Sequence, residues 1–144
     1  MYTVTRLARE AGASADAVRH YTDIGLLRPQ RDLANNYRRY TAADLQRLHF
    51  IRTSRDLGFG LEDIRTILTD ADRGDSPCPQ VRSLYERRLA EVDAEIARLT
   101  RRRDEMRDLL AQWKAMPDCV PTGDSLCHLV ERAATRSAGE CCHD

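Results

Sequence analysis

The chain has 144 residues, of which 42% are hydrophobic and 6% aromatic, and its formal charges cancel to zero. This length allows one compact domain or a small domain with an extended element. No apolar run reaches membrane-spanning length and no signal-peptide pattern is present, so we expect a cytoplasmic protein with no membrane segment. The charges divide unevenly, because residues 1–60 carry a net +4 and residues 61–144 a net −4. The basic part can therefore attract a polyanion.

The first residues have the capping pattern of two short helices. Thr5 can cap a helix over residues 6–11, and Gly12 stops it. Ser14 can cap a second helix that runs to about Tyr21. Two short helices joined by a turn that contains glycine are typical of a helix-turn-helix, although any small helical hairpin fits this spacing.

A hairpin and two further helices are predicted next. Asn35 and Asn36 are a turn signal between two short β-prone pieces, which indicates a hairpin wing. Thr41 and Asp44 resemble a capping box that opens a helix. The buried side of this helix is predicted to carry Leu45, Leu48, Ile51 and Leu57. A short amphipathic helix over residues 61–69 and a polar linker to Pro77 follow.

A long helix over residues 79–114 carries a narrow apolar seam. Its rungs alternate four and three residues apart, with Arg103 as the one polar exception. They are Tyr85, Leu89, Val92, Ile96, Leu99, Met106, Leu110 and Trp113. This spacing places every rung on one side of a helix about 54 Å long. Such a seam most simply packs against a second copy of itself.

Several motifs, in this order, resemble those of the MerR family of bacterial transcription regulators. They are Val18-Arg19-His20-Tyr21, Ile24-Gly25-Leu26-Leu27, Asn36-Tyr37-Arg38-Arg39-Tyr40 and Leu57-Gly58-Phe59. The resemblance covers residues 2 to about 114 and implies a mostly α fold. It implies a winged helix-turn-helix DNA-binding domain with connecting helices (1–70), a linker (71–78) and an antiparallel coiled-coil dimerisation helix (79–115). An effector-binding loop with a short helix (116–134) and a flexible Cys/His tail (135–144) would follow.

The same resemblance implies a homodimer that binds double-stranded promoter DNA and acts with RNA polymerase by distorting the promoter. By motif match, the residues that hold the phosphate backbone would be Arg19, Tyr21, Tyr37 and Arg38. The residues nearest the base edges would be Ser14, Ala15 and Asp16. His20 departs from the aromatic residue that is usual there, so phosphate contact and packing are both open. Tyr40 is expected to be partly buried between wing and core.

Five cysteines lie in the second half of the chain, and in a reducing compartment such residues bind metals or react more often than they form disulfides. Cys78 stands between two prolines and is expected at the N-cap of the long helix, where free N–H groups favour a thiolate. Cys119 and Cys127 flank a loop of seven residues. Soft thiolates select thiophilic ions, but this spacing alone is as often chance as a site.

Resemblance to the metal-sensing MerR members gives the cysteines a specific role. It implies a site for a thiophilic divalent ion (Zn, Cd, Hg or Pb, with Zn the most available) made by Cys78, Cys119 and Cys127 at the dimer interface. One departure is that Trp113 stands near the position where the first loop cysteine is usual. His128 is a possible replacement ligand, although a single surface histidine is more often only solvated. An accessory site could involve Cys141, Cys142 and His143.

Three functional hypotheses follow. The leading one is a metal-responsive transcription regulator that activates efflux or detoxification genes. The alternative on the same fold is a thiol-based sensor of an electrophile or oxidant through Cys78. The third is a coiled-coil interaction protein whose basic head binds DNA non-specifically. An enzyme is not expected, because no catalytic triad, phosphate loop or carboxylate pair is present.

Overall fold

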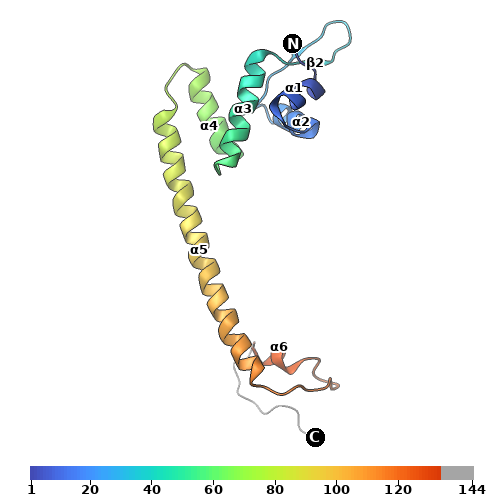
Figure 1. The fold of residues 1–144 in the computed structure, drawn as a ribbon, viewed down its shortest axis with the longest axis vertical. Helices are drawn as coiled ribbons and strands as arrows, with labels where there is room; N and C mark the ends of the chain where they lie inside the picture. The colour runs from blue at the N-terminus through green and yellow to red at the C-terminus, as the bar shows by residue number, and fades with distance from the viewer. Residues whose placement is uncertain (134–144) are drawn as a thin grey trace. The chain divides into compact units, whose positions relative to one another are not determined.

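The computed structural model describes residues 1–133, so the predicted Cys/His tail lies outside the described residues. The chain is mostly α-helical and divides into two compact units, residues 1–90 and 91–144. The elements in chain order are α1 (Val4–Ala11), α2 (Ala15–Asp23), β1 (Gln30–Arg31), β2 (Arg38–Arg39), α3 (Ala42–Asp56), α4 (Leu61–Asp72), α5 (Cys78–Lys114) and α6 (His128–Ala133) (Figure 1). This order confirms the predicted fold class, a winged helix-turn-helix followed by a long helix.

The helix-turn-helix consists of α1 and α2. Ser14 caps α2 as predicted, since its side chain accepts a hydrogen bond from the Ala17 N–H at 3.0 Å. The predicted cap of α1 is wrong, because Thr3, not Thr5, accepts the hydrogen bond from Arg6. Thr3 has the extended backbone that an N-cap needs, and the helix begins two residues earlier than expected. Gly12 ends α1 at φ 66°, a left-handed conformation that favours glycine.

The wing is a short antiparallel hairpin in which Gln30 pairs with Arg39 and Arg31 with Arg38. Side chains define its turn, since Asp32 accepts the Ala34 N–H at 2.8 Å. Asn36 has a left-handed backbone with φ 59°, which Asn tolerates better than most residues. A further bridge between Tyr2 and Tyr40 ties the wing to the N-terminus.

The core of the first unit is apolar and lies between the helix-turn-helix, α3, α4 and the first turns of α5. Its fully buried large side chains are Leu7, Val18, Leu26, Leu27, Tyr40, Leu48, Ile51, Ile64 and Ile67. The capping box of α3 is confirmed, because Thr41 and Asp44 bond reciprocally. Leu57 was predicted on the buried face but is 56% exposed. Leu57 is the C-cap residue after α3 ends at Asp56 and keeps a right-handed helical backbone.

Side chains of later helices donate hydrogen bonds to the backbone carbonyl groups at the ends of earlier helices. Arg52 of α3 donates to the Ala11 carbonyl at the end of α1, and Arg65 of α4 donates to the Ile24 carbonyl after α2. Helix ends leave carbonyls without intrahelical partners, and a guanidinium is well suited to satisfy them. These contacts fix the orientation of the helix-turn-helix on α3 and α4.

The long helix α5 begins at Cys78, which is therefore its first residue and not the N-cap that was predicted. The Pro77 carbonyl already accepts the first helical hydrogen bond, from Val81 at 2.9 Å. In the first unit, the Tyr85 hydroxyl donates to the Leu57 carbonyl at 2.9 Å, and Arg88 Nε donates to the Gly58 carbonyl at 2.8 Å. These bonds tie α5 to the turn between α3 and α4.

The apolar seam of α5 is exposed to solvent in the single chain. The exposed rungs are Tyr85, Leu89, Val92, Ile96, Leu99, Met106 and Leu110, each between 45% and 62% exposed. A continuous apolar face of this length is typical of a helix that pairs with another helix. Among the described residues, no helix is long and apolar enough to cross a membrane.

Substitution of Tyr40 should test how the wing is attached to the helix-turn-helix. Tyr40 is fully buried, which confirms and extends its predicted link between wing and core, and its hydroxyl lies 2.8 Å from Thr22 Oγ1. We expect Tyr40→Phe to lower the free energy of unfolding by about 1 kcal/mol, because the ring remains but one hydrogen bond is lost. Urea unfolding at a fixed protein concentration measures this change.

The matched control is Tyr37→Phe, because Tyr37 is 69% exposed. Its free energy of unfolding should stay within about 0.5 kcal/mol of the wild type. An equal loss in both variants, or none in Tyr40→Phe, would contradict the assigned contact.

Candidate DNA-binding and effector sites

The start of α2 presents the residues that were predicted to lie nearest DNA bases. Ser14 and Asp16 are exposed and Ala15 is half-buried. Asp16 Oδ1 forms an ion pair with Arg19 Nη1 at 2.8 Å on the surface of α2. The pair is exposed and carries little stability, so a phosphate group can replace the carboxylate as the partner of Arg19.

His20 and Tyr21 follow on the same helix but differ in burial. His20 is exposed, whereas Tyr21 is half-buried against the core cluster. Their ring centroids lie 5.8 Å apart. Because His20 is exposed, its ring is accessible to a ligand. The ring of Tyr21 packs against the core cluster and remains partly accessible.

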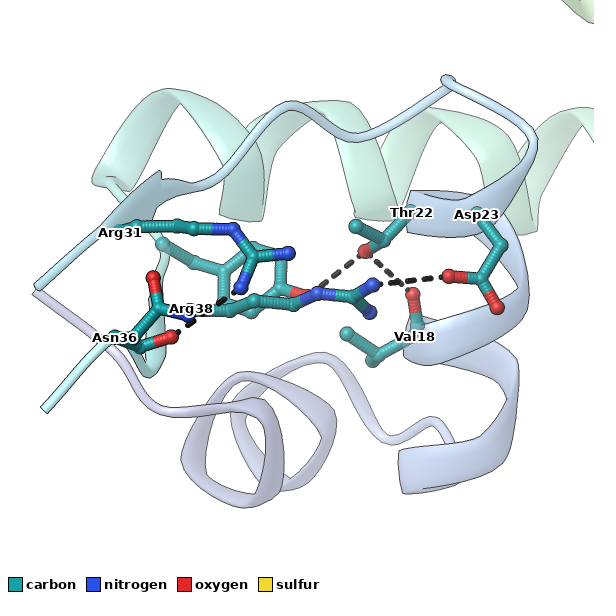
Figure 2. A network of polar contacts seen from close by, with 7 residues as sticks. Val18, Thr22, Asp23, Arg31, Asn36 and Arg38 are labelled. Carbon is teal, nitrogen blue, oxygen red and sulfur yellow. Dashed lines mark hydrogen bonds and ion pairs between the residues drawn. The ribbon is translucent and has the colours of Figure 1, made fainter.

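A polar network joins α2 to the wing (Figure 2). The Thr22 hydroxyl donates to the Val18 carbonyl at 2.8 Å. Because a threonine hydroxyl has one proton, the Tyr40 hydroxyl then donates to Thr22 Oγ1. On the same side, Arg38 Nη2 lies 3.0 Å from Asp23 Oδ1. Side chains therefore hold α2 and wing strand β2 in a fixed relative position.

The wing adds two exposed groups beside this network. Tyr37 precedes β2 and is largely exposed. Arg31 Nη1 donates to the Asn36 carbonyl at 3.3 Å (Figure 2). Guanidinium and phenol groups on one rigid surface are suited to phosphate oxygens. The sequence analysis did not identify Asp23 and Arg31, and the pairing of Arg38 with a residue fifteen positions earlier has no local sequence signal.

The second unit places α6 beside the end of α5 (Figure 1). Trp113 Nε1 donates to the Leu129 carbonyl at 3.1 Å. His128, expected on the surface, is buried, and its Nε2 lies 3.1 Å from the Pro117 carbonyl oxygen. Val130 of α6 is 62% exposed. Trp113 thus anchors the loop over residues 117–127.

The three cysteines predicted as metal ligands differ in whether they are free or disulfide-bonded. Cys78 and Cys127 are exposed free cysteines, and Cys119 is disulfide-bonded. Among the described residues, no group of three or more His, Cys, Asp and Glu side chains is placed to hold a metal ion within one chain. The two free thiols are soft donors that suit a thiophilic ion, and Cys119 can join them as a ligand only after reduction.

Glu131 organises the backbone next to Cys127. Its carboxylate accepts hydrogen bonds from the Ser125 hydroxyl, from the Leu126 N–H at 2.8 Å and from the Cys127 N–H at 3.4 Å. The Ser125 hydrogen bond, followed by that of Leu126, lowers the pKa of the Glu131 carboxyl from its usual value. The sequence analysis missed this residue.

The fold and the exposed α2 and wing surface define a class of protein, the winged helix-turn-helix DNA-binding proteins. A family model described as MerR HTH family regulatory protein matches residues 2–71. A second model, described as MerR, DNA binding, matches residues 45–109. The chain belongs to the MerR family, and it is a transcription regulator, not an enzyme.

The relatives cover most of the chain. HTH-type transcriptional regulator HmrR of Rhizobium leguminosarum bv. viciae is 35% identical, over 78% of this chain and 88% of the relative. A probable heavy metal-dependent transcriptional regulator of Haemophilus influenzae is 34% identical, over 67% of this chain and 75% of the relative. The transcription regulator PbrR691 from Ralstonia metallidurans CH34, solved in complex with lead(II), aligns with a TM-score of 0.73 and 28% identity. This alignment covers 91% of this chain and 98% of that one.

The ion pair between Arg38 and Asp23 generates a prediction for DNA binding. We expect Arg38→Gln to weaken binding roughly tenfold on specific and random duplexes alike, because a phosphate contact is independent of sequence. The slope of log affinity against log salt should also fall by about 1. Fluorescence anisotropy across a salt series measures both quantities.

The control is Arg98→Gln, because Arg98 lies in the middle of α5 and pairs with Glu95. This variant should bind DNA as the wild type does. A wild-type salt slope in Arg38→Gln would rule out a phosphate contact by this residue.

Proposed function

We propose that the protein is a metal-responsive transcription regulator. In this proposal it binds promoter DNA as a homodimer, distorts it, and activates efflux or detoxification genes with RNA polymerase when a thiophilic divalent ion binds. The observation that carries the proposal is the pair of exposed free thiols, Cys78 and Cys127, in a chain 28% identical to a regulator solved with lead(II). Such a regulator acts in the cytoplasm.

The exposed seam of α5 supports the dimer. Seven large apolar side chains on one helix face are costly to leave in water, and an identical helix offers a matching face. We assign residues 79–115 to antiparallel pairing and residues 1–70 to DNA binding, with 71–78 as the linker. The effector region is 116–134, and 135–144 is its tail.

The geometry of the proposed DNA-binding domain, residues 1–70, supports recognition of DNA by its shape as well as by base contacts. We propose that Arg19, His20, Tyr21, Tyr37 and Arg38 contact the phosphate backbone. The residues assigned to the base edges are Ser14, Ala15 and Asp16. The network through Thr22 makes this surface rigid. A change in the angle between the DNA-binding domains of the two subunits would therefore be imposed on the DNA as bending or untwisting.

The proposed metal ligands are Cys78 of one subunit and Cys119 and Cys127 of the other. A site shared between subunits agrees with the lack of a three-ligand group among the described residues of one chain. The ion would supply a strong cross-link between thiolates of two chains, stabilising one dimer arrangement. Zn, Cd, Hg and Pb all suit these ligands, with Zn the most available. Trp113 does not replace a ligand in this proposal, since its indole donates to the loop backbone.

Metal titration with and without reductant tests the proposal. We expect the reduced protein to bind zinc, cadmium or lead more tightly than micromolar, and Cys78→Ser to weaken binding at least about 100-fold. The oxidised protein should also bind more weakly, because the disulfide removes the Cys119 thiolate. Competition with a chromophoric chelator measures affinity, and a promoter–reporter fusion measures induction.

The control variant is Ser83→Ala, which changes an exposed position on the same helix and should bind metal normally. Normal induction by metal in Cys78→Ser would overturn the metal site. Induction that survives a chelator, with covalent modification of Cys78 by an electrophile, would instead support the thiol-based sensor. Equal affinity for random and promoter DNA would support a non-specific coiled-coil protein.

A further inference from the structure

Glu131 binds the backbone of Cys127 on both sides. Its carboxylate oxygen Oε1 accepts the Cys127 N–H at 3.4 Å, and its own N–H donates to the Cys127 carbonyl at 3.1 Å. The same Oε1 accepts the Leu126 N–H at 2.8 Å, and Oε2 accepts the Ser125 hydroxyl. We refer to Glu131 with Ser125, Leu126 and Cys127 as the loop clasp.

The loop clasp connects a structured turn to α6. The Thr122 N–H donates to the Ser125 carbonyl at 2.8 Å, and the Ser125 N–H donates to Thr122 Oγ1 at 3.1 Å. This turn therefore closes residues 122–125 on themselves. Glu131 then binds the end of the turn and the start of α6 with one side chain, so the backbone before and after Cys127 has little freedom.

Two further contacts hold α6 without Glu131. They are the bond from Trp113 to the Leu129 carbonyl and the contact of His128 with the Pro117 carbonyl. Position and rotation of α6 are thus set by Trp113 and His128, while the residues that lead into it are set by Glu131. Removal of the clasp should loosen Leu126 and Cys127 more than it loosens the helix.

We infer that Glu131 is the positioning residue of the effector loop, which holds the Cys127 backbone in one conformation before a metal ion arrives. The inference deepens the proposed function and rests on it only for the role of Cys127 as a ligand. Ordering the ligand backbone in advance lowers the entropy lost on binding. The role is one of hydrogen-bond geometry, and the carboxylate itself is not assigned as a ligand.

The metal-free dimer tests the clasp directly, with Glu131→Asp as the decisive variant. Aspartate keeps the charge but is one methylene shorter, so it cannot reach the same three donors. We expect amide hydrogen exchange at Leu126 and Cys127 to become at least about tenfold faster, because a bonded N–H must open before it exchanges. Emission from Trp113, the one tryptophan of the chain, should change less, since Trp113 bonds to the Leu129 carbonyl and to no residue of the loop clasp.

Zinc titration of the reduced protein then measures the consequence for the ligand. Glu131→Asp should bind zinc roughly tenfold more weakly, in the range that outer hydrogen-bonding partners contribute to metal sites. Glu131→Gln, which keeps the length and one acceptor oxygen, should recover part of the protection. The matched control is Asp124→Asn, which removes a carboxylate from the same loop and should leave exchange and affinity unchanged.

The possible outcomes separate the inference from the proposed function. Wild-type exchange at Leu126 and Cys127 in Glu131→Asp would overturn the clasp. A loss of zinc affinity in Asp124→Asn equal to that in Glu131→Asp would overturn it as well, since the effect would then not be specific to the hydrogen bonds of Glu131. If the wild type binds no metal, the proposed function fails, while the exchange measurement still decides whether Glu131 orders the loop.

Discussion

The arrangement of the first unit depends on one constraint, the need to satisfy the backbone carbonyls where each short helix ends. Arg52 satisfies the end of α1, Arg65 satisfies the end of α2, and Tyr85 and Arg88 satisfy the end of α3. In each case the donor belongs to a later helix. The carbonyls bonded by Arg52 and Arg65 are part-buried, where a carbonyl without a partner is costly, so these contacts fix the orientation of α1 and α2 on α3 and α4. The bonds from Tyr85 and Arg88 lie at the surface and attach α5 to the turn after α3.

The candidate DNA-binding surface combines a framework of partly buried hydrogen bonds with surface ion pairs whose acidic partners can be replaced by phosphate. Tyr40 and Thr22 are buried or half-buried and hold the wing against α2. Arg19 and Arg38 are paired with acidic neighbours at the surface, where ion pairs contribute little. Phosphate groups can therefore replace those neighbours at small cost while the framework stays unchanged. In the dimer that we propose, such a surface would transmit the angle between the two DNA-binding units to the DNA.

The second unit shows how a short loop without a core can still be ordered. Trp113 bonds to α6 through its indole N–H, and Glu131 of α6 bonds to the residues before the helix through its carboxylate. Backbone hydrogen bonds replace the buried apolar area that a longer segment would supply. The free thiol of Cys127 therefore stands on a defined backbone although it is exposed. The disulfide at Cys119 makes the number of available thiolates depend on redox state.

The sequence by itself determined the order of the helices, the caps at Ser14 and Thr41 and the seam of α5, because these follow from local periodicity and capping chemistry. The fold class followed from the resemblance of its motifs to those of the MerR family. The sequence could not determine which side chains meet across the chain. The pairing of Arg38 with Asp23 and the inward turn of His128 depend on tertiary packing. Glu131 likewise acquires its role only because the loop folds back over its carboxylate. Local rules place residues on elements, and only the packed structure decides which donors and acceptors come within hydrogen-bond distance.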